Sequence, residues 1–253
     1  MAHITLHFNC SPLELDEEQV LDYLHVLKSK NKTPSGSFFK HTVYGLRYLY
    51  RIYGLKEMRV VLPTIKRPNK LPVVLSYQEV KLLLKTPKLL KHRLVLAMLY
   101  GCGLRCFELR NLQLKDLDFD RKMLHIRQGK GSKDRYVPLS AMQIRGLQTY
   151  ISVEHPRIWC FNGNHTEGTP VPLSTRGIQW IIREARKHSG INKQVTTHSF
   201  RHSYATHLLE MGLDIISIKE LLGHADIQTT LVYLHVAQLG RQKPFSPLDR
   251  LYS

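Results

Sequence analysis

Two basic side chains, His198 and Arg201, lie three residues apart in the segment HSFRHSYATHLL. Residues at this spacing share one face of a helix, so both side chains can reach the same ligand. His198 and His202 also have the spacing of a zinc-binding helix, but Ser199 takes the place of the glutamate that a metalloprotease needs, and no third ligand is evident. We therefore predict no metal site here. The simplest alternative to a functional role is that His198 and Arg201 bind backbone carbonyls near the start of the helix.

Two further cations are placed where they can project from the chain. Arg105 directly follows the Gly-x-Gly-Leu end of a helix in GLRCFELRNL, and Lys130 lies on a glycine-rich turn in GKGSKDRYVPL. Each also has an ordinary structural explanation, because Arg105 can pair with Glu108 and Lys130 can be solvated at a hairpin tip. Lys133 lies on the same turn and is the nearest competitor for any role given to Lys130.

The segment LLGHADIQTTLVYLHV holds His224 directly after a glycine and Tyr233 nine residues later. This interval allows the histidine to lie at a helix junction and the tyrosine on the next helix, with both facing one ligand. Because Leu231 and Leu234 lie close to it in sequence, Tyr233 also fits the description of a packed core aromatic. Tyr136, in the hairpin, is a weaker rival for a nucleophilic role.

Taken together, these segments resemble the tyrosine recombinase (phage integrase) family over nearly the whole chain. The family's set of six residues falls on Arg105, Lys130, His198, Arg201, His224 and Tyr233. KRPNKLPVVLSYQEVKLLL looks like the entry to the family's catalytic domain, and SPLDRL is similar to the ends of integron and transposon enzymes. The resemblance is closest to Xer-type and integron or transposon-type integrases. The extra segment that integron integrases carry ahead of the histidine–arginine motif is missing, so duplex DNA is the expected substrate.

This resemblance implies DNA strand cleavage and rejoining through a covalent tyrosine intermediate. Arg105 and Arg201 would donate paired hydrogen bonds to the nonbridging oxygens of a phosphodiester, where charge builds up. Tyr233, with a reference pKa of about 10, would attack phosphorus and give its proton to a neutral His198. The resemblance implies that Lys130 protonates the leaving 5′ oxygen and that His224 hydrogen-bonds the phosphate or the tyrosine. Because the 3′-phosphotyrosyl link keeps the bond energy, strand exchange would need no ATP. The two arginines would do the electrostatic work that a metal does elsewhere, so no metal or other cofactor is expected.

The chain is predicted to be mainly α-helical with a small β-sheet, with an N-terminal helical, SAM-like DNA-binding domain before an α+β catalytic domain. An amphipathic helix that begins near Asp16 precedes a second one in SFFKHTVYGLRYLYRIYGL. Three prolines in LPTIKRPNKLPVVLS favour an extended connection. We therefore place the first domain at 1–63, about one helix short of the family's usual four, a linker at 64–72, and the catalytic domain with its tail at 73–253.

Local signals predict the elements of the catalytic domain. Ser76 and Glu79 have the pattern of a capping box before a helix, and KHRLVLAMLYGCG continues as a second helix. Leu124 and Ile126 alternate with polar residues before the glycine-rich turn, which predicts a β-hairpin. Four more helices are predicted from residue 175 onward, in RGIQWIIREARKHSG, HSFRHSYATHLLEMG, DIISIKELLG and IQTTLVYLHVA.

The chain is strongly basic, with 37 Lys and Arg against 20 Asp and Glu and a formal net charge of +17. Basic residues recur along the whole length, a pattern that suits a protein bound around a polyanion, although a generically basic surface is the alternative. The expected DNA contacts, in the first domain and the linker, are Lys28, Lys30, Lys32, Lys40, Arg47, Arg51, Lys66, Arg67 and Lys70.

No apolar run approaches the roughly 18 residues of a membrane span, and the start of the chain lacks a signal-peptide pattern. The four cysteines form no CxxC pair, so reduced structural thiols are expected. We expect a cytoplasmic recombinase that binds a double-stranded recombination site, for integration or excision of a mobile element or for resolution. The family implies four protomers on two duplexes. The alternatives are a type IB topoisomerase-like enzyme that relaxes DNA and a DNA-binding accessory without recombination.

Overall fold

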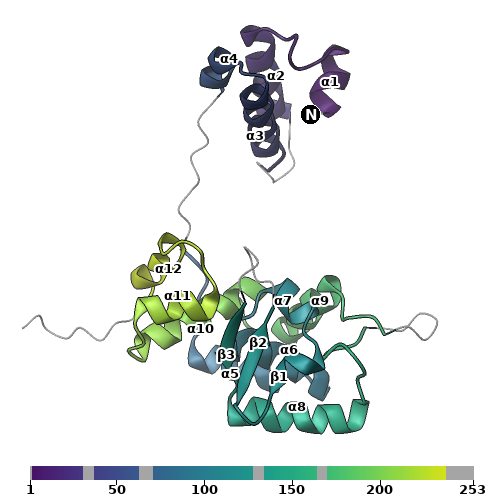
Figure 1. Ribbon diagram of the computed structural model, residues 1–253, viewed down its shortest axis with the longest axis vertical. Helices are drawn as coiled ribbons and strands as arrows, with labels where there is room; N and C mark the ends of the chain where they lie inside the picture. The colour runs from purple at the N-terminus through teal and green to yellow at the C-terminus, as the bar shows by residue number, and fades with distance from the viewer. Residues whose placement is uncertain (1, 31–36, 63–70, 128–133, 164–169, 238–253) are drawn as a thin grey trace, which may run out of the picture. The chain divides into compact units, whose positions relative to one another are not determined.

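The computed structural model describes residues 2–30, 37–62, 71–127, 134–163 and 170–237 (Figure 1). The chain divides into two compact units, Met1–Asn69 and Lys70–Ser253, and each is described by itself; the domain boundaries drawn from the sequence stay predictions. Most described elements are helices, and one sheet has three strands. The predicted fold class, mainly helical with a small sheet, is therefore confirmed. Among the described residues, no helix is both long enough and apolar enough to cross a membrane.

The described part of the first unit holds four helices, α1 (Ala2–Phe8), α2 (Glu17–Lys30), α3 (Ser37–Ile52) and α4 (Lys56–Val61). Acidic side chains in the first turn of α2 are favourable at a helix N-terminus. The core of the unit is formed by Ile4, Leu15, Val20, Tyr23, Leu24, Val43, Leu46, Tyr50 and Leu62. The structure does not show the expected shortfall of one helix. The sequence pattern missed α1 and α4 because helices of seven and six residues are too short to show a clear periodicity.

The second unit begins with α5 (Tyr77–Lys85), α6 (Leu90–Gly101), α7 (Cys106–Arg110) and the 3-10 turn η1 (Leu114–Asp116). The strands β1 (Leu117–Asp118), β2 (Met123–Ile126) and β3 (Arg135–Pro138) precede the helices α8 (Ala141–Glu154) and α9 (Thr175–Ser189). The last described elements are α10 (Thr197–Glu210), α11 (Ile215–Leu222), α12 (Gln228–Leu231) and the 3-10 turn η2 (Val232–His235).

Two of the predicted local signals are confirmed in the second unit. Ser76 and Glu79 form a capping box at the start of α5, in which the Ser76 backbone N–H donates to the Glu79 carboxylate at 2.7 Å. Strands β2 and β3 pair antiparallel, with Leu124 opposite Val137. Both of these side chains are fully buried, so one face of the hairpin packs on the core.

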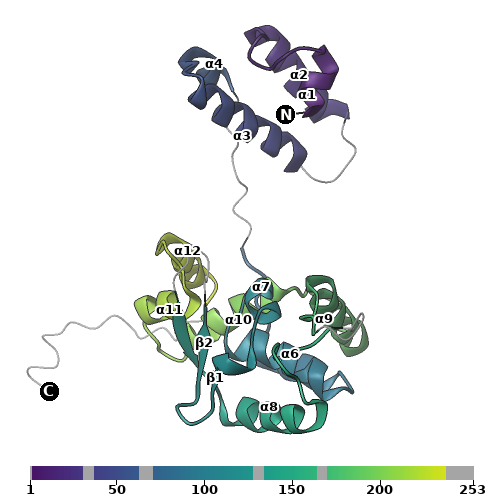
Figure 2. The same cartoon turned by 45° about the vertical axis from the view of Figure 1, so that its right-hand side comes forward.

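Helix α10 runs through the middle of the second unit (Figure 2). Ten of its fourteen residues are buried, and it packs against α6, α11 and η2. Its N-cap is Thr196, whose hydroxyl accepts a hydrogen bond from the Ser199 N–H at 3.2 Å. A helix enclosed on this many sides holds its side chains in fixed directions, which suits it to carry site residues.

The prediction of one regular helix at the end of the described chain is wrong. In place of one regular helix, the structure has the four-residue α12 followed by the 3-10 turn η2, which carries Tyr233. Three β-branched residues, Thr229, Thr230 and Val232, lower the helix propensity of this segment. The Thr229 hydroxyl also donates to the Asp226 carbonyl at 2.6 Å, a local bond that competes with a regular helix.

Candidate active site

Arg201 is a buried cation on the central helix α10. Its side chain is 4% exposed. Nη1 donates to the Gly103 carbonyl at 2.6 Å, and Nη2 donates to the Leu222 carbonyl at 2.5 Å. Burial, followed by the positive charge of Arg105, lowers the pKa of Arg201 to about 10. The side chain therefore remains a cation at neutral pH.

Arg105 is the residue that precedes the first turn of α7, and it is partly open to solvent, with a side chain 21% exposed. Its backbone N–H and its Nη1 donate to the two carboxylate oxygens of Glu108, each at 2.8 Å. Its Nη2 donates to the Gly223 carbonyl at 3.2 Å. The pairing with Glu108, which the sequence offered as an alternative to a functional role, thus fixes Arg105 beside Arg201.

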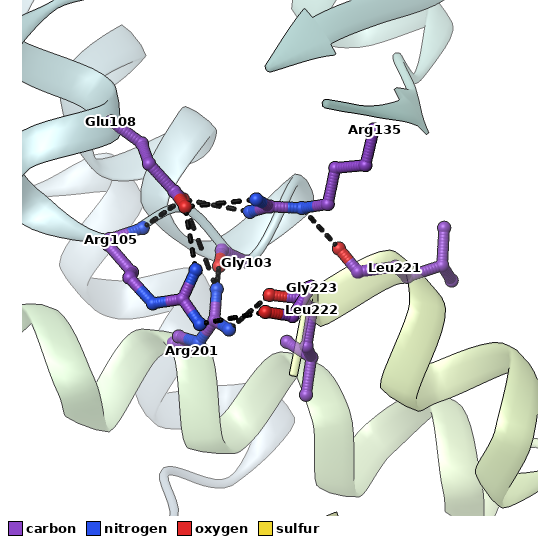
Figure 3. Close-up of polar contacts among 8 residues, drawn as sticks. All are labelled: Gly103, Arg105, Glu108, Arg135, Arg201, Leu221, Leu222 and Gly223. Atoms are coloured by element: carbon purple, nitrogen blue, oxygen red, sulfur yellow. Dashed lines mark hydrogen bonds and ion pairs between the residues drawn. The ribbon is translucent and has the colours of Figure 1, made fainter. Parts of the chain in front are cut away.

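Glu108 lies at the centre of three arginines (Figure 3). Besides Arg105, the Nη1 and Nη2 atoms of Arg135 donate to it at 2.9 and 2.8 Å, and Nη1 of Arg201 lies 4.0 Å away. Burial alone would raise the pKa of Glu108, but the hydrogen bonds and charges of Arg135, then of Arg105, lower that pKa to about 2. Three cations therefore surround one carboxylate that stays ionised, and the cluster keeps a positive charge suited to an anion.

Tyr233, on η2, is 1% exposed, and its hydroxyl lies 3.1 Å from Nδ1 of His202. Burial raises the pKa of Tyr233, whereas the charges of Arg201 and Arg105 lower it. Burial, with the neighbouring charges of His198 and Arg201, lowers the pKa of His202 to about 4. The imidazole of His202 is therefore neutral at pH 7 and is able to accept the phenol proton.

The structure does not bring His198, the predicted proton acceptor, to the phenol. His198 is exposed on the first turn of α10, and the centre of its ring lies 6.2 Å from that of His202. His202, one turn further along α10, holds the contact instead, since side chains four residues apart lie one above the other. The sequence suggested His202 only as half of a metal-binding spacing.

His224 follows the left-handed Gly223 that ends α11, and its Nδ1 lies 2.9 Å from the hydroxyl of Thr230. Thr230 is fully buried. Burial, then the charges of Arg201, Arg105 and Arg135, lowers the pKa of His224 to about 4. When the Thr230 hydroxyl donates to Nδ1, the neutral imidazole carries its proton on Nε2. From Nε2 the ring can donate a hydrogen bond to a phosphate oxygen.

The structure thus brings together Arg105, Arg201 and His224 near the end of α11, and Tyr233 against the helix that carries Arg201. Lys130 and its competitor Lys133 lie outside the described residues. Tyr136, the rival nucleophile, is 56% exposed on β3 and stacks on His125. The sequence assigned no role to Arg135 or Thr230, whose only signals were their positions near the motif residues.

The predicted DNA contacts are described only in part. On α3, Lys40 is half-buried and Arg51 is exposed, with the Arg51 guanidinium 5.4 Å from the ring centre of Tyr48. Arg47 is half-buried, and its Nη2 donates to the Leu62 carbonyl at 3.2 Å. Outside the described residues or side chains lie Lys28, Lys30, Lys32, Lys66, Arg67 and Lys70.

Comparison with known proteins gives consistent results. Residues 74–239 match the model of the phage integrase family. The putative integrase/recombinase y4qK of Sinorhizobium fredii (strain NBRC 101917 / NGR234) is 34% identical, over 96% of this chain and 80% of that protein. Tyrosine recombinase XerA of Thermococcus onnurineus (strain NA1) is 35% identical, over 88% of this chain and 78% of that protein.

Two solved structures extend the comparison. A crystal structure of XerA recombinase is 28% identical and has a TM-score of 0.60, over 99% of this chain and 87% of that one. The site-specific recombinase XerH, bound to a palindromic difH substrate in a post-cleavage complex, has a TM-score of 0.71 at 21% identity, over 90% of this chain and 71% of that one. The second likeness concerns the fold.

Proposed function

Because the chain belongs to the phage integrase family, we propose that Tyr233 is the nucleophile of its recombination reaction and that Arg105, Arg201 and His224 bind the scissile phosphate. The chain is a tyrosine recombinase, an enzyme that cleaves and rejoins DNA strands at specific sites. The observation that supports this assignment of residues is the convergence of Arg105 and Arg201 on neighbouring carbonyls at the end of α11.

The two guanidiniums supply the charge that phosphoryl transfer requires. As the phenol oxygen attacks phosphorus, negative charge concentrates on the nonbridging oxygens, and fixed hydrogen-bond donors lower the energy of that state. Arg105 is the solvent-facing cation, and Arg201 lies buried behind it. His224 adds a neutral donor to the same phosphate, and His198, exposed at the start of α10, completes the set of phosphate ligands.

The protons move in two steps in this proposal. Tyr233 gives its proton to His202, because that imidazole is neutral and within hydrogen-bond distance. The bond from the phenol oxygen to phosphorus forms while the bond from phosphorus to the 5′ oxygen breaks. Lys130, assigned by the family resemblance, protonates the departing 5′ oxygen. Attack by the 5′-hydroxyl of another strand reverses the step, so rejoining needs no energy source.

The substrate in this proposal is a double-stranded recombination site, and the net charge of +17 supports binding to a polyanion. Among the predicted DNA contacts, Lys40, Arg47 and Arg51 on α3 have side chains that the structure describes. We propose a tetramer on two duplexes in the cytoplasm, which serves the integration or excision of a mobile element or resolution. An assay on paired sites tests recombination, and relaxation of supercoiled DNA in the absence of a second site tests the topoisomerase-like alternative.

The test uses a nicked duplex that carries the sequence selected by the wild-type protein from a random pool. After cleavage, the short fragment between the cleaved bond and the nick dissociates and carries the free 5′-hydroxyl away. Religation is then prevented, so the covalent complex accumulates. We expect Tyr233→Phe to bind this duplex with wild-type affinity and to form no covalent complex, because phenylalanine lacks the attacking oxygen. Tyr136→Phe is the matched control and should form the complex at the wild-type rate. A covalent complex with Tyr233→Phe would remove Tyr233 from its role.

A further inference from the structure

Arg135, the first residue of β3, uses its whole guanidinium in the arginine cluster. Its Nη1 and Nη2 form a parallel fork with the two carboxylate oxygens of Glu108, at 2.9 and 2.8 Å. Its Nε donates to the Leu221 carbonyl at 2.8 Å. The side chains of Arg135 and Glu108 are 8% and 7% exposed, so this pair is buried. It can act on a bound phosphate only indirectly, through the residues that it contacts.

Three successive carbonyls at the end of α11 accept hydrogen bonds from three different arginines (Figure 3). The pairs are Leu221 with Arg135, Leu222 with Arg201, and Gly223 with Arg105. The last carbonyls of a helix lack partners within the helix and carry partial negative charge, so they attract cations. The end of α11 therefore holds the three guanidiniums side by side at a spacing set by the backbone.

The close packing at Gly223 shows how tightly Arg135 is held there. Gly223 has a φ of +62°, a conformation that glycine adopts without strain. A Cβ at this position would lie 3.0 Å from Nη1 and 3.1 Å from Cδ of Arg135. The Arg135 side chain thus lies directly against the turn whose carbonyl binds Arg105, and a change in its position would disturb that turn.

We propose that Arg135 is a positioning residue for recombination. By holding Glu108 on one side and the end of α11 on the other, it sets the distance and orientation of the Arg105 and Arg201 guanidiniums that receive the scissile phosphate. Arg135 does not touch the substrate in this scheme. The inference rests on the proposed function, because the phosphate is assigned to Arg105 and Arg201 there.

Lysine at position 135 separates geometry from charge. It keeps the positive charge but has no planar fork, so it cannot bind both oxygens of Glu108 and the Leu221 carbonyl together. Arg127 provides a matched control, because its guanidinium also forms two contacts with a buried carboxylate, Asp116, at 2.7 and 3.0 Å. The carboxylate that Arg127 binds belongs to Asp116 of η1 and is not the Glu108 carboxylate at the centre of the arginine cluster.

The experiment compares Arg135→Lys and Arg127→Lys in the full chain, on the nicked duplex selected by the wild-type protein. We measure the urea midpoint of unfolding, the affinity for the duplex and the rate of covalent complex formation. A misplacement of the guanidiniums by about 1 Å should slow complex formation by Arg135→Lys on the order of 100-fold. Arg127→Lys should keep the wild-type rate, and both variants should bind the duplex with wild-type affinity.

A second duplex distinguishes positioning from general damage to the fold. It carries a methylphosphonate at the cleaved position, which replaces one charged nonbridging oxygen by a neutral methyl group. Because less negative charge then builds up on the reacting phosphate, its stabilisation depends less on the two guanidiniums. The loss of rate in Arg135→Lys relative to wild type should therefore be smaller on this duplex. Equal rates for the two lysine variants, or a defect of the same size on both duplexes, would overturn the inference. A wild-type protein that forms no covalent complex would instead overturn the proposed function.

Discussion

The two halves of the candidate site are built in different ways. The half that we propose receives the phosphate is an arginine cluster, in which hydrogen bonds between 2.5 and 3.2 Å join Arg105, Arg135, Arg201 and Glu108 to one another and to backbone carbonyls. The proposed nucleophile, Tyr233, lies on a short 3-10 turn, and its hydroxyl is hydrogen-bonded to His202. One half is rigid through many shared contacts, and the other rests on a short, weakly helical segment.

This difference has a functional meaning. Electrostatic stabilisation is most effective when the donors are already oriented before the substrate arrives, which matches the arginine half. Tyr233 is only 1% exposed, so in the proposed mechanism its hydroxyl must become accessible before it attacks a phosphate. The segment η2 packs on α10 and α12, and Tyr233 belongs to a buried apolar cluster, so these apolar contacts, and not the hydrogen bonds of the arginines, are the ones that must change.

The largest effect is expected from Glu108→Gln, which removes the negative charge at the centre of the rigid half. Three guanidiniums would then lie close together without their carboxylate, and loss of one partner of a buried ion pair costs about 3–5 kcal/mol of unfolding free energy. Urea unfolding measures this loss. Glu79→Gln is the control, because its partner Lys193 is 45% exposed, and it should cost about 1 kcal/mol or less.

The pH dependence of the unfolding free energy provides a second test of the charge on Glu108. The pKa of Glu108 is lowered from its ordinary value of 4.5 to about 2 in the folded protein. A lowered carboxylate pKa contributes stability that is complete above about pH 4.5 and is lost as the pH falls towards 2. The difference in unfolding free energy between wild type and Glu108→Gln should therefore shrink over this range. A difference that is independent of pH would show that Glu108 is not ionised in the folded state.

The next effect concerns the proton of Tyr233. His202→Phe should slow covalent complex formation by about 100-fold or more, because a positioned base is lost, while affinity for the duplex is unchanged. In the wild type, the rate should fall at acid pH as His202 becomes protonated. Burial lowers the pKa of His202 to about 4, and a phosphate close to the ring would raise that pKa because it favours the imidazolium.

His198→Phe is the paired comparison for this prediction. It should keep the acid-side fall of the rate, since His198 is exposed and is assigned to the phosphate. Loss of that pH dependence in His198→Phe, with its retention in His202→Phe, would give the base role to His198, as the sequence suggested.

The smallest effect is expected from Thr230→Val, which keeps the shape of the side chain but removes the hydroxyl that contacts Nδ1 of His224. Loss of one hydrogen bond of about 1 kcal/mol should slow cleavage roughly fivefold, because the imidazole is no longer held in one tautomer. Thr229→Val is the control on the same helix, because the exposed Thr229 hydroxyl donates to the Asp226 carbonyl and not to His224. Equal rates for the two variants would show that Thr230 does not orient His224.

Much of the framework followed from local signals in the sequence. The capping box at Ser76, the hairpin through Leu124 and Val137, and the helices that carry Arg201 and precede His224 all depend on neighbouring residues, which a sequence displays directly. The break between α12 and η2 was missed, because the pattern of apolar residues there also fits a regular helix. The β-branched residues and the bond from the Thr229 hydroxyl to the Asp226 carbonyl favour the broken form, but the apolar pattern was given more weight than these local signals.

The site was predictable in its residue types but not in its contacts. His198 and His202 have almost the same sequence context, and only their positions around α10 determine which one faces Tyr233. Arg105 showed two explanations, a surface pair with Glu108 and a phosphate ligand, and the structure shows that the pair is formed and that it holds the guanidinium in the site. The proposed role of Arg135 depends on Leu221 of α11, 86 residues later in the chain, and no local sequence pattern reports such a contact.

The most direct test of the account is to map the covalent link by mass spectrometry after cleavage of the nicked duplex and digestion with nuclease and protease. We predict that the peptide containing Tyr233 carries a nucleotide joined through its 3′ phosphate to the phenol oxygen. A nucleotide joined to any other side chain, Tyr136 included, would contradict the central claim.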